Sequence, residues 1–263
     1  MDSTSRPLAL VTGASGGIGA DLARELARHG HDLVLSARGV PAMETLADEF
    51  RALGSTVTVI GADLGRPGGA AALLDEVQRR GFAVDVLINN AGLGAAGRFH
   101  QNEPGRITEM LEVNIVSLTE LTRALLPGMI ARRRGRIMLV ASIAGFQPGP
   151  RMAVYFATKA YVLSLGEALA YELRNSGVTV TTLCPGATAT NFFNAAGANH
   201  SLMAKKMRRM MPSQDVARLG YEGMMAGRRV VVTGAMNRIT ALGGRYAPHW
   251  LTLPVTDLLM SGE

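Results

Sequence analysis

The sequence is poor in cysteine and in long apolar runs, and each shortage excludes a class of protein. Cys184 is the only cysteine among 263 residues, so no disulfide can form within the chain. The longest apolar stretches, such as Val84–Ile88 and Ile137–Ala141, are far too short to span a bilayer. The first seven residues also lack the apolar segment of a signal peptide. We therefore expect a cytoplasmic protein without a membrane span.

Aromatic residues are scarce too, although basic residues outnumber acidic ones and give a net charge of +6. The densest basic runs are Arg132–Arg134 and the group Lys205, Lys206, Arg208 and Arg209. Sites for single-stranded nucleic acid interleave cations with aromatic stacking residues, and neither run does so. We interpret both runs as solvated faces and expect no nucleic-acid partner. The five histidines show no i,i+4 pairing, so no metal site is predicted.

Short apolar segments alternate with amphipathic ones along most of the chain. The short segments are rich in Val, Leu and Ile without strict alternation, which is typical of parallel strands covered on both faces. Repeated strand–helix–strand order predicts a parallel sheet with right-handed crossovers. We expect one α/β domain over residues 1–263, a doubly wound Rossmann-type sheet of about seven strands with helices on both faces. The predicted strands are Leu8–Val11, Asp32–Ser36, Thr56–Ile60, Val84–Asn89, Arg136–Ala141, Val178–Leu183 and Arg229–Thr233.

Amphipathic stretches between these segments predict helices, among them Leu22–His29, Met43–Leu53 and Leu73–Arg80. Two longer helices, Arg106–Arg133 and Met152–Asn175, carry broad apolar faces. A residual apolar face on such a helix often forms a subunit interface. We therefore expect a homodimer or a homotetramer.

A glycine-rich turn follows the first predicted strand. Thr12–Gly19 reads Thr-Gly-Ala-Ser-Gly-Gly-Ile-Gly, and a predicted helix begins at once. Glycines let the backbone turn sharply and approach a pyrophosphate, which then lies at the helix N-terminus. A simple tight loop uses the same residues, but the flanking strand and helix favour a dinucleotide site. The predicted contacts of this turn are Gly13, Ser15, Gly16, Gly17, Ile18 and Gly19.

A carboxylate is missing about twenty residues beyond the glycines, where NAD sites usually place one against the ribose 2′-hydroxyl. Ala37 and Arg38 stand there instead, and the Arg38 guanidinium could bind a 2′-phosphate. The alternative is that Arg38 is a surface cation at the start of a loop. NADP is favoured, and NAD is not excluded. Asp63 and Leu64 could bracket the adenine, with helix capping as the alternative for Asp63.

The fourth predicted strand ends in small residues, Asn90, Ala91 and Gly92. Small residues there allow a ligand to approach closely, and an asparagine can fix the neighbouring backbone. A turn uses the same residue types, so this segment gains its meaning from its position. We include it among the predicted cofactor contacts.

Lysine is scarce, with three residues against twenty-four arginines, and Lys159 follows Tyr155 by one helical turn. Residues four apart share a helix face, so both can meet one ligand. A phenol with a pKa near 10 is a poor acid–base group at neutral pH, and a nearby ammonium stabilises its phenolate. Ser142, at the end of a predicted strand, could hydrogen-bond a substrate oxygen. Each residue alone could be structural, but together behind the glycine turn they predict a hydride-transfer site.

These motifs closely resemble the short-chain dehydrogenase/reductase family over almost the whole chain. The matching segments are Thr12–Gly19, Asp63, Asn89–Gly92, Asn114, Ser142, Tyr155–Lys159, and Pro185-Gly186 followed by Thr190.

The resemblance implies a role for each catalytic residue. Tyr155 would be the acid–base residue, and Ser142 would orient and polarise the carbonyl. Lys159 would bind the nicotinamide ribose and lower the pKa of Tyr155. Asn114 would hold a water that links Lys159 to solvent. The residues expected beside the nicotinamide or the pyrophosphate are Pro185, Gly186, Thr188 and Thr190. One departure is Gly16, which stands where many NADP-dependent members have a basic residue, so a preference for NADP rests on Arg38.

The stretch 191–212 is expected to form a lid over a small-molecule substrate. Methionine adapts to irregular apolar surfaces, so an apolar ketone, 3-oxoacyl or steroid-like, is predicted. The alternative is that the same side chains pack a lid helix onto the domain. Two functions follow: an NADP-dependent carbonyl reductase, or a non-catalytic NADP-binding sensor or scaffold on the same fold. The apolar residues expected in the lid are Phe192, Phe193, Leu202, Met203, Met207, Met210 and Met211, and those expected in the pocket wall are Phe146, Gln147 and Met152.

Overall fold

Seven parallel strands form the central sheet of the computed structural model, which describes residues 6–198, 201–202 and 210–261. Their order is β3-β2-β1-β4-β5-β6-β9, so the chain changes direction across the sheet between β1 and β4. In open α/β sheets, ligands bind outside the carboxyl ends of the strands at such a point. The strands are β1 (Leu8–Thr12), β2 (Asp32–Ala37), β3 (Val57–Gly61), β4 (Val86–Asn89), β5 (Gly135–Val140), β6 (Val178–Cys184) and β9 (Val230–Val232).

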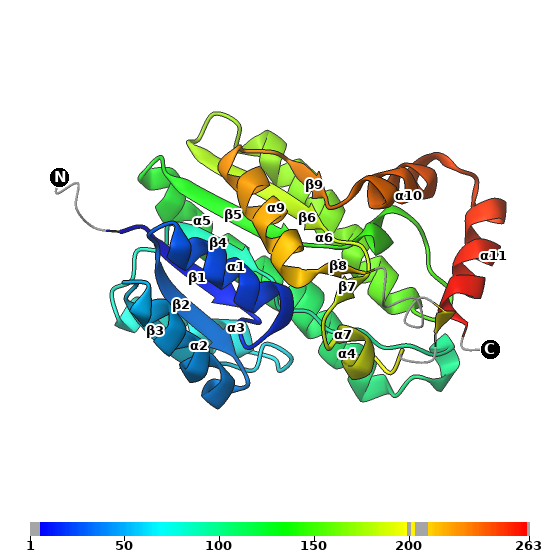
Figure 1. Ribbon diagram of the computed structural model, residues 1–263, viewed down its shortest axis with the longest axis horizontal. Coiled ribbons are helices and arrows are strands. Elements are labelled where there is room, and N and C mark those ends of the chain that lie inside the picture. The colour runs from blue at the N-terminus through cyan, green and yellow to red at the C-terminus, as the bar shows by residue number, and fades with distance from the viewer. Residues whose placement is uncertain (1–5, 199–200, 203–209, 262–263) are drawn as a thin grey trace.

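Helices cover both faces of this sheet (Figure 1). One face carries α1 (Gly17–Arg28), α2 (Val40–Ala52) and α9 (Ser213–Met225). The other face carries α3 (Gly69–Arg79), α5 (Leu118–Ala131) and α6 (Ala153–Glu172). Alternate residues of β1 enter the two cores, as the two-residue period of a strand requires. The predicted doubly wound fold of about seven strands is confirmed.

The long helix expected over Arg106–Arg133 is interrupted in the structure. It consists of α4 (Pro104–Leu111), a π-helical turn η2 (Glu112–Ser117), and α5. The turn contains Asn114, whose side chain bonds to the Leu93 backbone and to Thr158 instead of facing solvent. Single π-helical turns within helices are frequent at functional sites. Hydropathy alone could not show this interruption, because the apolar pattern continues through it.

A second, two-stranded parallel sheet was not expected. It pairs β7 (Thr188–Ala189) with β8 (Met211–Pro212), at the two ends of the predicted lid. The short helix α7 (Phe192–Ala195) follows β7 directly. This pairing therefore joins the chain just before the predicted lid to the end of the predicted lid, next to the carboxyl end of β6.

Two further helices, α10 (Ala235–Tyr246) and α11 (His249–Met260), end the described chain. They were not predicted either, and α11 lies at the end of the molecule opposite β3 (Figure 1). α10 contacts the 3₁₀ turn η3 (Ile143–Phe146), while a second such turn, η1 (Phe99–Gln101), precedes α4. None of the described helices is both long enough and apolar enough to cross a membrane.

Candidate functional site

The glycine turn after β1 has little room for side chains. Gly13 and Gly17 have φ values of +63° and +56°, which strain other residues. A Cβ atom on Gly19 would lie 2.3 Å from the Gly13 carbonyl oxygen, and one on Gly13 would lie 2.8 Å from Nδ2 of Asn90. By contrast, Gly16 has open space around it. The turn thus needs glycine for its shape at Gly13, Gly17 and Gly19, whereas a Cβ atom at Gly16 would meet no other atom.

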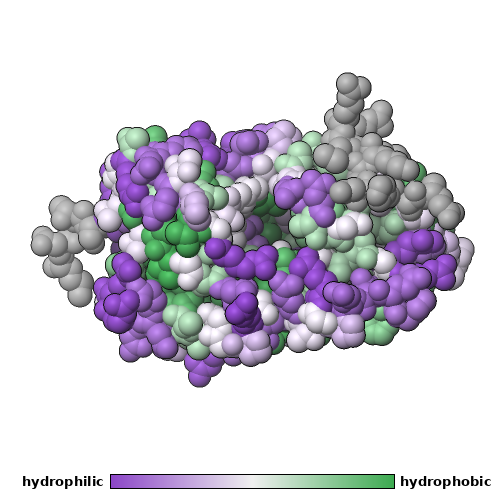
Figure 2. All heavy atoms as spheres, turned by 90° about the horizontal axis from the view of Figure 1, so that it is seen from below, coloured by the Kyte–Doolittle hydropathy of each residue, from purple (hydrophilic) through white to green (hydrophobic). Residues whose placement is uncertain are grey.

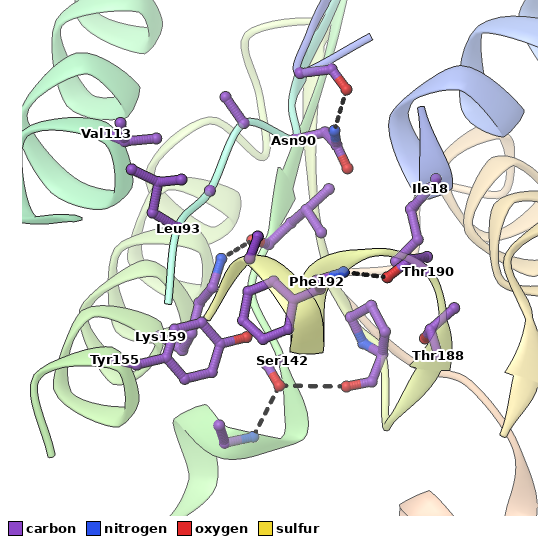
Figure 3. Close-up of a pocket in the computed structure, with 18 of the residues that line it drawn as sticks. Ile18, Asn90, Leu93, Val113, Ser142, Tyr155, Lys159, Thr188, Thr190 and Phe192 are labelled. Atoms are coloured by element: carbon purple, nitrogen blue, oxygen red, sulfur yellow. Dashed lines mark hydrogen bonds between the residues drawn. The ribbon is translucent and has the colours of Figure 1, made fainter. Parts of the chain in front are cut away.

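Thr12 and Asn90 brace this turn from below. Oγ1 of Thr12 accepts hydrogen bonds of 3.1 Å from the amides of Asn90 and Ala91 and donates to the Ile88 carbonyl. Nδ2 of Asn90 donates to the carbonyls of Thr12 and Gly13 at 3.0 and 3.2 Å (Figure 3). The segment after β4 therefore sets the shape of the turn after β1. We did not single out Thr12 from the sequence, although it directly precedes the glycines.

A cavity of about 650 Å³ lies at the carboxyl ends of the strands. Ligand pockets typically measure about 300–1,000 Å³. Arg38 and Asp63 lie along its wall, as do the glycine turn, Ser142 and the Tyr155–Lys159 pair. The molecule seen from the side of α2, α4 and α7 is hollowed at its middle, with apolar residues in the hollow and polar ones along much of its rim (Figure 2). All the residues predicted from the sequence to contact the cofactor line the cavity except Gly19, which lies beneath the turn.

The end of the cavity next to β2 has the features of a site for the adenosine half of a dinucleotide. Ser36 is among the residues that line it, and its fully buried Oγ has no hydrogen-bond partner among the described residues. Arg38 also lines it, and its Nη1 lies 2.9 Å from Oε1 of Glu109. Asp63 accepts a 3.1 Å hydrogen bond from the Gly65 amide within a local turn. The helix-capping alternative considered for it is wrong, because α3 begins at Gly69 with Gly68 as its N-cap and without a side-chain cap. A buried hydroxyl without a partner, an arginine and a side-chain-free turn at a helix start fit a nicotinamide dinucleotide.

The three central polar residues meet at the opposite end of the cavity. The Tyr155 hydroxyl points toward Ser142 (Figure 3). Oγ of Ser142 accepts a 3.1 Å hydrogen bond from the Ala144 amide and donates to the Pro185 carbonyl at 3.4 Å. Nζ of Lys159 donates to the Val140 carbonyl at 2.8 Å and lies 5.8 Å from the centre of the Tyr155 ring. The sequence prediction that these residues share one site is therefore supported by their positions.

Burial dominates the electrostatics of this end. It raises the pKa of Tyr155 to about 12, and hydrogen bonding with Ser142 offsets only part of that rise. Burial also lowers the pKa of Lys159 to about 8. The family resemblance led us to expect a lowered pKa for Tyr155, and the pKa is raised instead because desolvation outweighs the hydrogen bond with Ser142. Tyr155 is thus a neutral phenol at neutral pH, the form that can donate a proton.

Asn114 does not line the cavity, and its side chain is largely used within the protein. Its Oδ1 accepts a 2.8 Å hydrogen bond from the Leu93 amide. Its Nδ2 donates at 2.9 Å to both the Leu93 carbonyl and Oγ1 of Thr158. A Cβ atom on Gly92 would lie 3.5 Å from Asn114 Oδ1 and 3.4 Å from Lys159 Nζ, so both groups flank Gly92. This geometry suits a positioning residue behind Lys159, and the water-holding role stays a prediction.

Helix α7, which belongs to the predicted lid, packs against Tyr155. The Phe192 ring lies 5.2 Å from the Tyr155 ring, centre to centre, and Phe193 also lines the cavity. Met210 packs into the same apolar cluster, whereas Met211 packs against the core that holds α1 and α9. Leu202 lies outside the cavity wall, and its amide donates to the Ser261 carbonyl. Met203, Lys205, Lys206, Met207, Arg208 and Arg209, also named in the sequence analysis, lie outside the described residues.

The pocket-wall predictions near η3 were partly wrong. Gln147 and Met152 line the cavity, but Phe146 packs against the core beneath α6. It was expected in the wall because it follows Ser142 closely, and the 3₁₀ turn of η3 directs it elsewhere. The wall also includes residues that we missed because α10 and α11 were not predicted. These are Thr240, Thr256, Leu259 and Met260, and Oγ1 of Thr256 accepts a 2.9 Å hydrogen bond from Gln147 Nε2.

Metal-binding groups are a separate question. Across residues 6–198, 201–202 and 210–261, no three His, Cys, Asp or Glu side chains are grouped so that they could hold a metal ion. Cys184, the one cysteine, is buried.

The buried Lys159 should make the stability of the fold depend on pH. Its pKa falls from 10.5 to about 8, so between these values the unfolded chain binds the proton that the folded chain has released. The free energy of unfolding should therefore rise with pH from about 8 to 10.5 for this group. Lys159→Met should remove this rise and stabilise the fold at pH 7 by about 1–3 kcal/mol.

Urea unfolding of both proteins from pH 7 to 10 would measure the difference. Arg228→Met, which removes an exposed cation, is the matched control and should leave the pH dependence unchanged. Parallel pH profiles for the native chain and Lys159→Met would contradict the predicted shift.

Comparisons with known proteins agree with this geometry. The short chain dehydrogenase family model matches residues 7–201. A short-chain dehydrogenase from Sphingobium yanoikuyae, solved with NADPH, is 36% identical with a TM-score of 0.80, covering 90% of this chain and 92% of that one. The bulky-bulky ketone specific alcohol dehydrogenase from Comamonas testosteroni is 31% identical with a TM-score of 0.78, covering 92% and 93%. A Burkholderia phymatum member, solved with NAD, is 27% identical with a TM-score of 0.80, covering 92% and 94%. Sequence, fold and site together show that the chain belongs to the short-chain dehydrogenase/reductase family, nicotinamide-dependent oxidoreductases that act on CH–OH groups.

Proposed function

We propose that this protein is an NADP-dependent reductase of apolar ketones, acting in reverse on the corresponding secondary alcohols. The observation that carries the proposal is a neutral, half-buried Tyr155 beside Ser142 and Lys159, at the apolar end of a cavity whose other end carries Arg38. A sensor or scaffold without catalysis would not need this complete polar set in a desolvated pocket.

The residues of the site divide the chemistry among them. A bound nicotinamide dinucleotide supplies or accepts the hydride. Tyr155 donates its proton to the carbonyl oxygen, and Ser142 orients that oxygen by a hydrogen bond. Lys159 is charged below about pH 8, so it stabilises the phenolate that remains when Tyr155 has lost its proton. The start of α1 binds the pyrophosphate through the backbone amides of the glycine turn.

The segment between β6 and the predicted lid completes the cofactor site. A Cβ atom on Gly17 would lie 3.1 Å from Cγ2 of Thr190, so Thr190 faces the glycine turn across the cavity. Its Oγ1 accepts from the Phe192 amide at 3.3 Å, which joins this contact to α7 (Figure 3). Pro185, Gly186 and Thr188 line the same stretch. We infer that this segment holds the nicotinamide end of the cofactor.

An apolar substrate is favoured by the cluster around Tyr155. Met152, Phe156 and Phe193 are buried there, and Met260 packs against them from α11. The similarity to the bulky-bulky ketone specific alcohol dehydrogenase from Comamonas testosteroni supports the same class. The preference for NADP is supported by Arg38 at the cavity wall and by the absence of a carboxylate at Ala37. Relatives solved with NADPH and with NAD leave the choice to the residues of this chain.

The C-terminal helices suggest how the chain associates with a second copy. Apolar side chains are exposed on one side of each helix: Met236, Ile239, Leu242 and Tyr246 on α10, and Trp250, Leu251, Val255 and Leu258 on α11. Tyr246 and Trp250 are each 76% exposed, and an aromatic residue carries about 150–250 Å² of surface. These two alone expose about 300 Å², a large share of the roughly 800 Å² that one partner contributes to a stable interface.

A membrane surface fits α11 less well, because this helix contains no lysine or arginine to meet anionic lipid, although α10 carries Arg238 and Arg245. We therefore propose a homodimer or homotetramer built through α10 and α11, and not through the longer helices as the sequence suggested. A cytoplasmic location stays a prediction of the sequence.

Tyr155→Phe tests the catalytic proposal. It removes the proton donor and keeps the ring that packs against Phe192, so ketone reduction should fall by at least 10²-fold while NADPH binding persists. NADPH consumption would be followed with 3-oxoacyl thioesters, steroids, sugars and aromatic aldehydes. Equal turnover by the native chain and the variant, or no turnover of any substrate by the native chain, would exclude the proposed activity.

Arg38→Ala tests the cofactor proposal. Removing the guanidinium should weaken NADPH binding about tenfold or more and leave NADH binding nearly unchanged, because only NADPH carries the 2′-phosphate. Dissociation constants for both cofactors would be measured by titration calorimetry. Equal losses for NADPH and NADH would show that Arg38 does not bind the 2′-phosphate.

Light scattering coupled to size-exclusion chromatography tests the association. The native chain should elute at a multiple of 27.8 kDa, and Leu242→Asp with Leu258→Asp should at least halve that mass. Ile130→Asp, which changes an exposed apolar residue of α5, is the matched control and should keep the native mass. A monomeric native chain, or an unchanged mass in the C-terminal variant, would contradict the proposed interface.

A further inference from the structure

Glu109 connects the candidate 2′-phosphate residue to a second arginine. This glutamate lies on α4, and its Oε1 is 2.9 Å from Nη1 of Arg38 at the end of β2. Its Oε2 is 2.8 Å from Nη1 of Arg106, one turn earlier on the same helix. One carboxylate thus binds two guanidinium groups that are 68 residues apart in the sequence. Glu109 itself does not line the cavity, whereas Arg38 does.

The carboxylate of Glu109 is held from two sides. Nη2 of Arg106 also donates to the carbonyls of Gly94 and Ala195, at 3.3 and 3.0 Å. A Cβ atom on Gly65 would lie 2.7 Å from Cγ of Glu109, so the glutamate stem rests where residue 65 has no side chain. Glu109 is mostly buried, with 26% of its side chain exposed against 58% for Arg38. The glutamate is therefore the more enclosed partner, and Arg38 is the more accessible member of the pair.

A 2′-phosphate would compete with this carboxylate for Arg38. An arginine binds a phosphate best when both arms of its fork are free, and Glu109 already occupies one of them. A phosphate monoester carries about two negative charges at neutral pH, so it would also be repelled by a carboxylate beside its binding arginine. NADH meets neither cost, because its ribose carries an uncharged hydroxyl at that position.

We propose that Glu109 is a specificity-determining residue that lowers the preference of this protein for NADPH over NADH by holding Arg38. The proposal rests on the proposed function, in which Arg38 binds the 2′-phosphate. It assigns the cofactor selectivity to a pair of residues, Arg38 at the cavity wall and Glu109 behind it. A basic residue at Arg38 alone would predict a strong preference for NADPH, and the pair predicts a modest one.

Arg66, which lies beside Asp63, does not substitute for Arg38 at the adenosine end of the cavity. Arg66 pairs with Asp63 at 3.2 Å and is 82% exposed, and it does not line the cavity. Among the residues that the structure describes, Arg38 and Lys159 are the only cationic side chains of the cavity wall. Lys159 lies at the catalytic end, so Arg38 is the one whose charge a 2′-phosphate would meet.

Equilibrium binding of NADPH and NADH to the full chain tests the proposal without any substrate. The variants are Glu109→Gln, Arg38→Ala and the double variant, with circular dichroism to check folding. Glu120→Gln changes an exposed glutamate of α5 that forms no ion pair with any residue the structure describes; it removes the same charge and is the matched control. Glutamine keeps the shape of Glu109 and removes its charge.

Glu109→Gln should tighten NADPH binding about two- to fivefold, the size expected for releasing a partly exposed ion pair, and leave NADH binding unchanged. In the Arg38→Ala background the same substitution should have no selective effect, and Glu120→Gln should have none in either background. The measured quantity is the factor by which Glu109→Gln raises the preference for NADPH over NADH. If this factor is at least twofold smaller in the Arg38→Ala background than in the native chain, the two residues are coupled.

Two results would overturn the inference and separate it from the proposed function. In the first, Arg38→Ala selectively weakens NADPH binding, but Glu109→Gln leaves NADPH binding unchanged or tightens it equally in the Arg38→Ala background. The inference then fails, and the proposed binding of the 2′-phosphate by Arg38 stands. If Arg38→Ala weakens NADPH and NADH equally, the proposed cofactor preference fails, and the role of Glu109 fails with it.

Discussion

The desolvation of Tyr155 and Lys159 is the constraint on which the site depends. Burial moves the two pKa values apart, to about 12 for the phenol and about 8 for the ammonium, and in both cases favours the uncharged form. A surface tyrosine loses its proton near pH 10, whereas this one, with the Phe192 ring 5.2 Å from its own ring, holds its proton to a higher pH. The cost of keeping Lys159 buried is offset in part by its hydrogen bond to the Val140 carbonyl.

The fold supplies this environment through the order of its strands. The chain changes direction between β1 and β4, and the segments after these strands bind each other through Thr12 and Asn90. The same edge of the sheet ends in Ser142 after β5 and in Pro185 after β6, which are joined by a hydrogen bond. The cofactor turn and the catalytic residues thus lie on one rim, formed by the segments that follow β1, β4, β5 and β6. This explains why residues from distant parts of the sequence share one cavity.

Much of this rim could be predicted from the sequence, because its motifs are local. The glycine turn, the small residues after β4 and the Tyr155–Lys159 spacing each depend on a few neighbouring residues and a simple period. Properties that depend on tertiary contacts could not be predicted in this way. The π-helical turn at Asn114 follows from bonds to Leu93 and Thr158, and the pairing of Arg38 with Glu109 joins segments 71 residues apart. The direction of the Tyr155 pKa was also missed, because it depends on burial that the sequence does not state.

The claim at the centre of this account is that the cavity transfers hydride between nicotinamide and a carbonyl carbon. Incubation with NADPH carrying deuterium at C4 of the nicotinamide and an apolar ketone, followed by mass spectrometry of the alcohol, tests it most directly. The account predicts one deuterium atom on the carbinol carbon of the product, with none there when the label is in the solvent instead. The experiment would be run with each of the two C4 hydrogens of NADPH replaced in turn by deuterium. Alcohol without deuterium from both labelled cofactors would contradict the account.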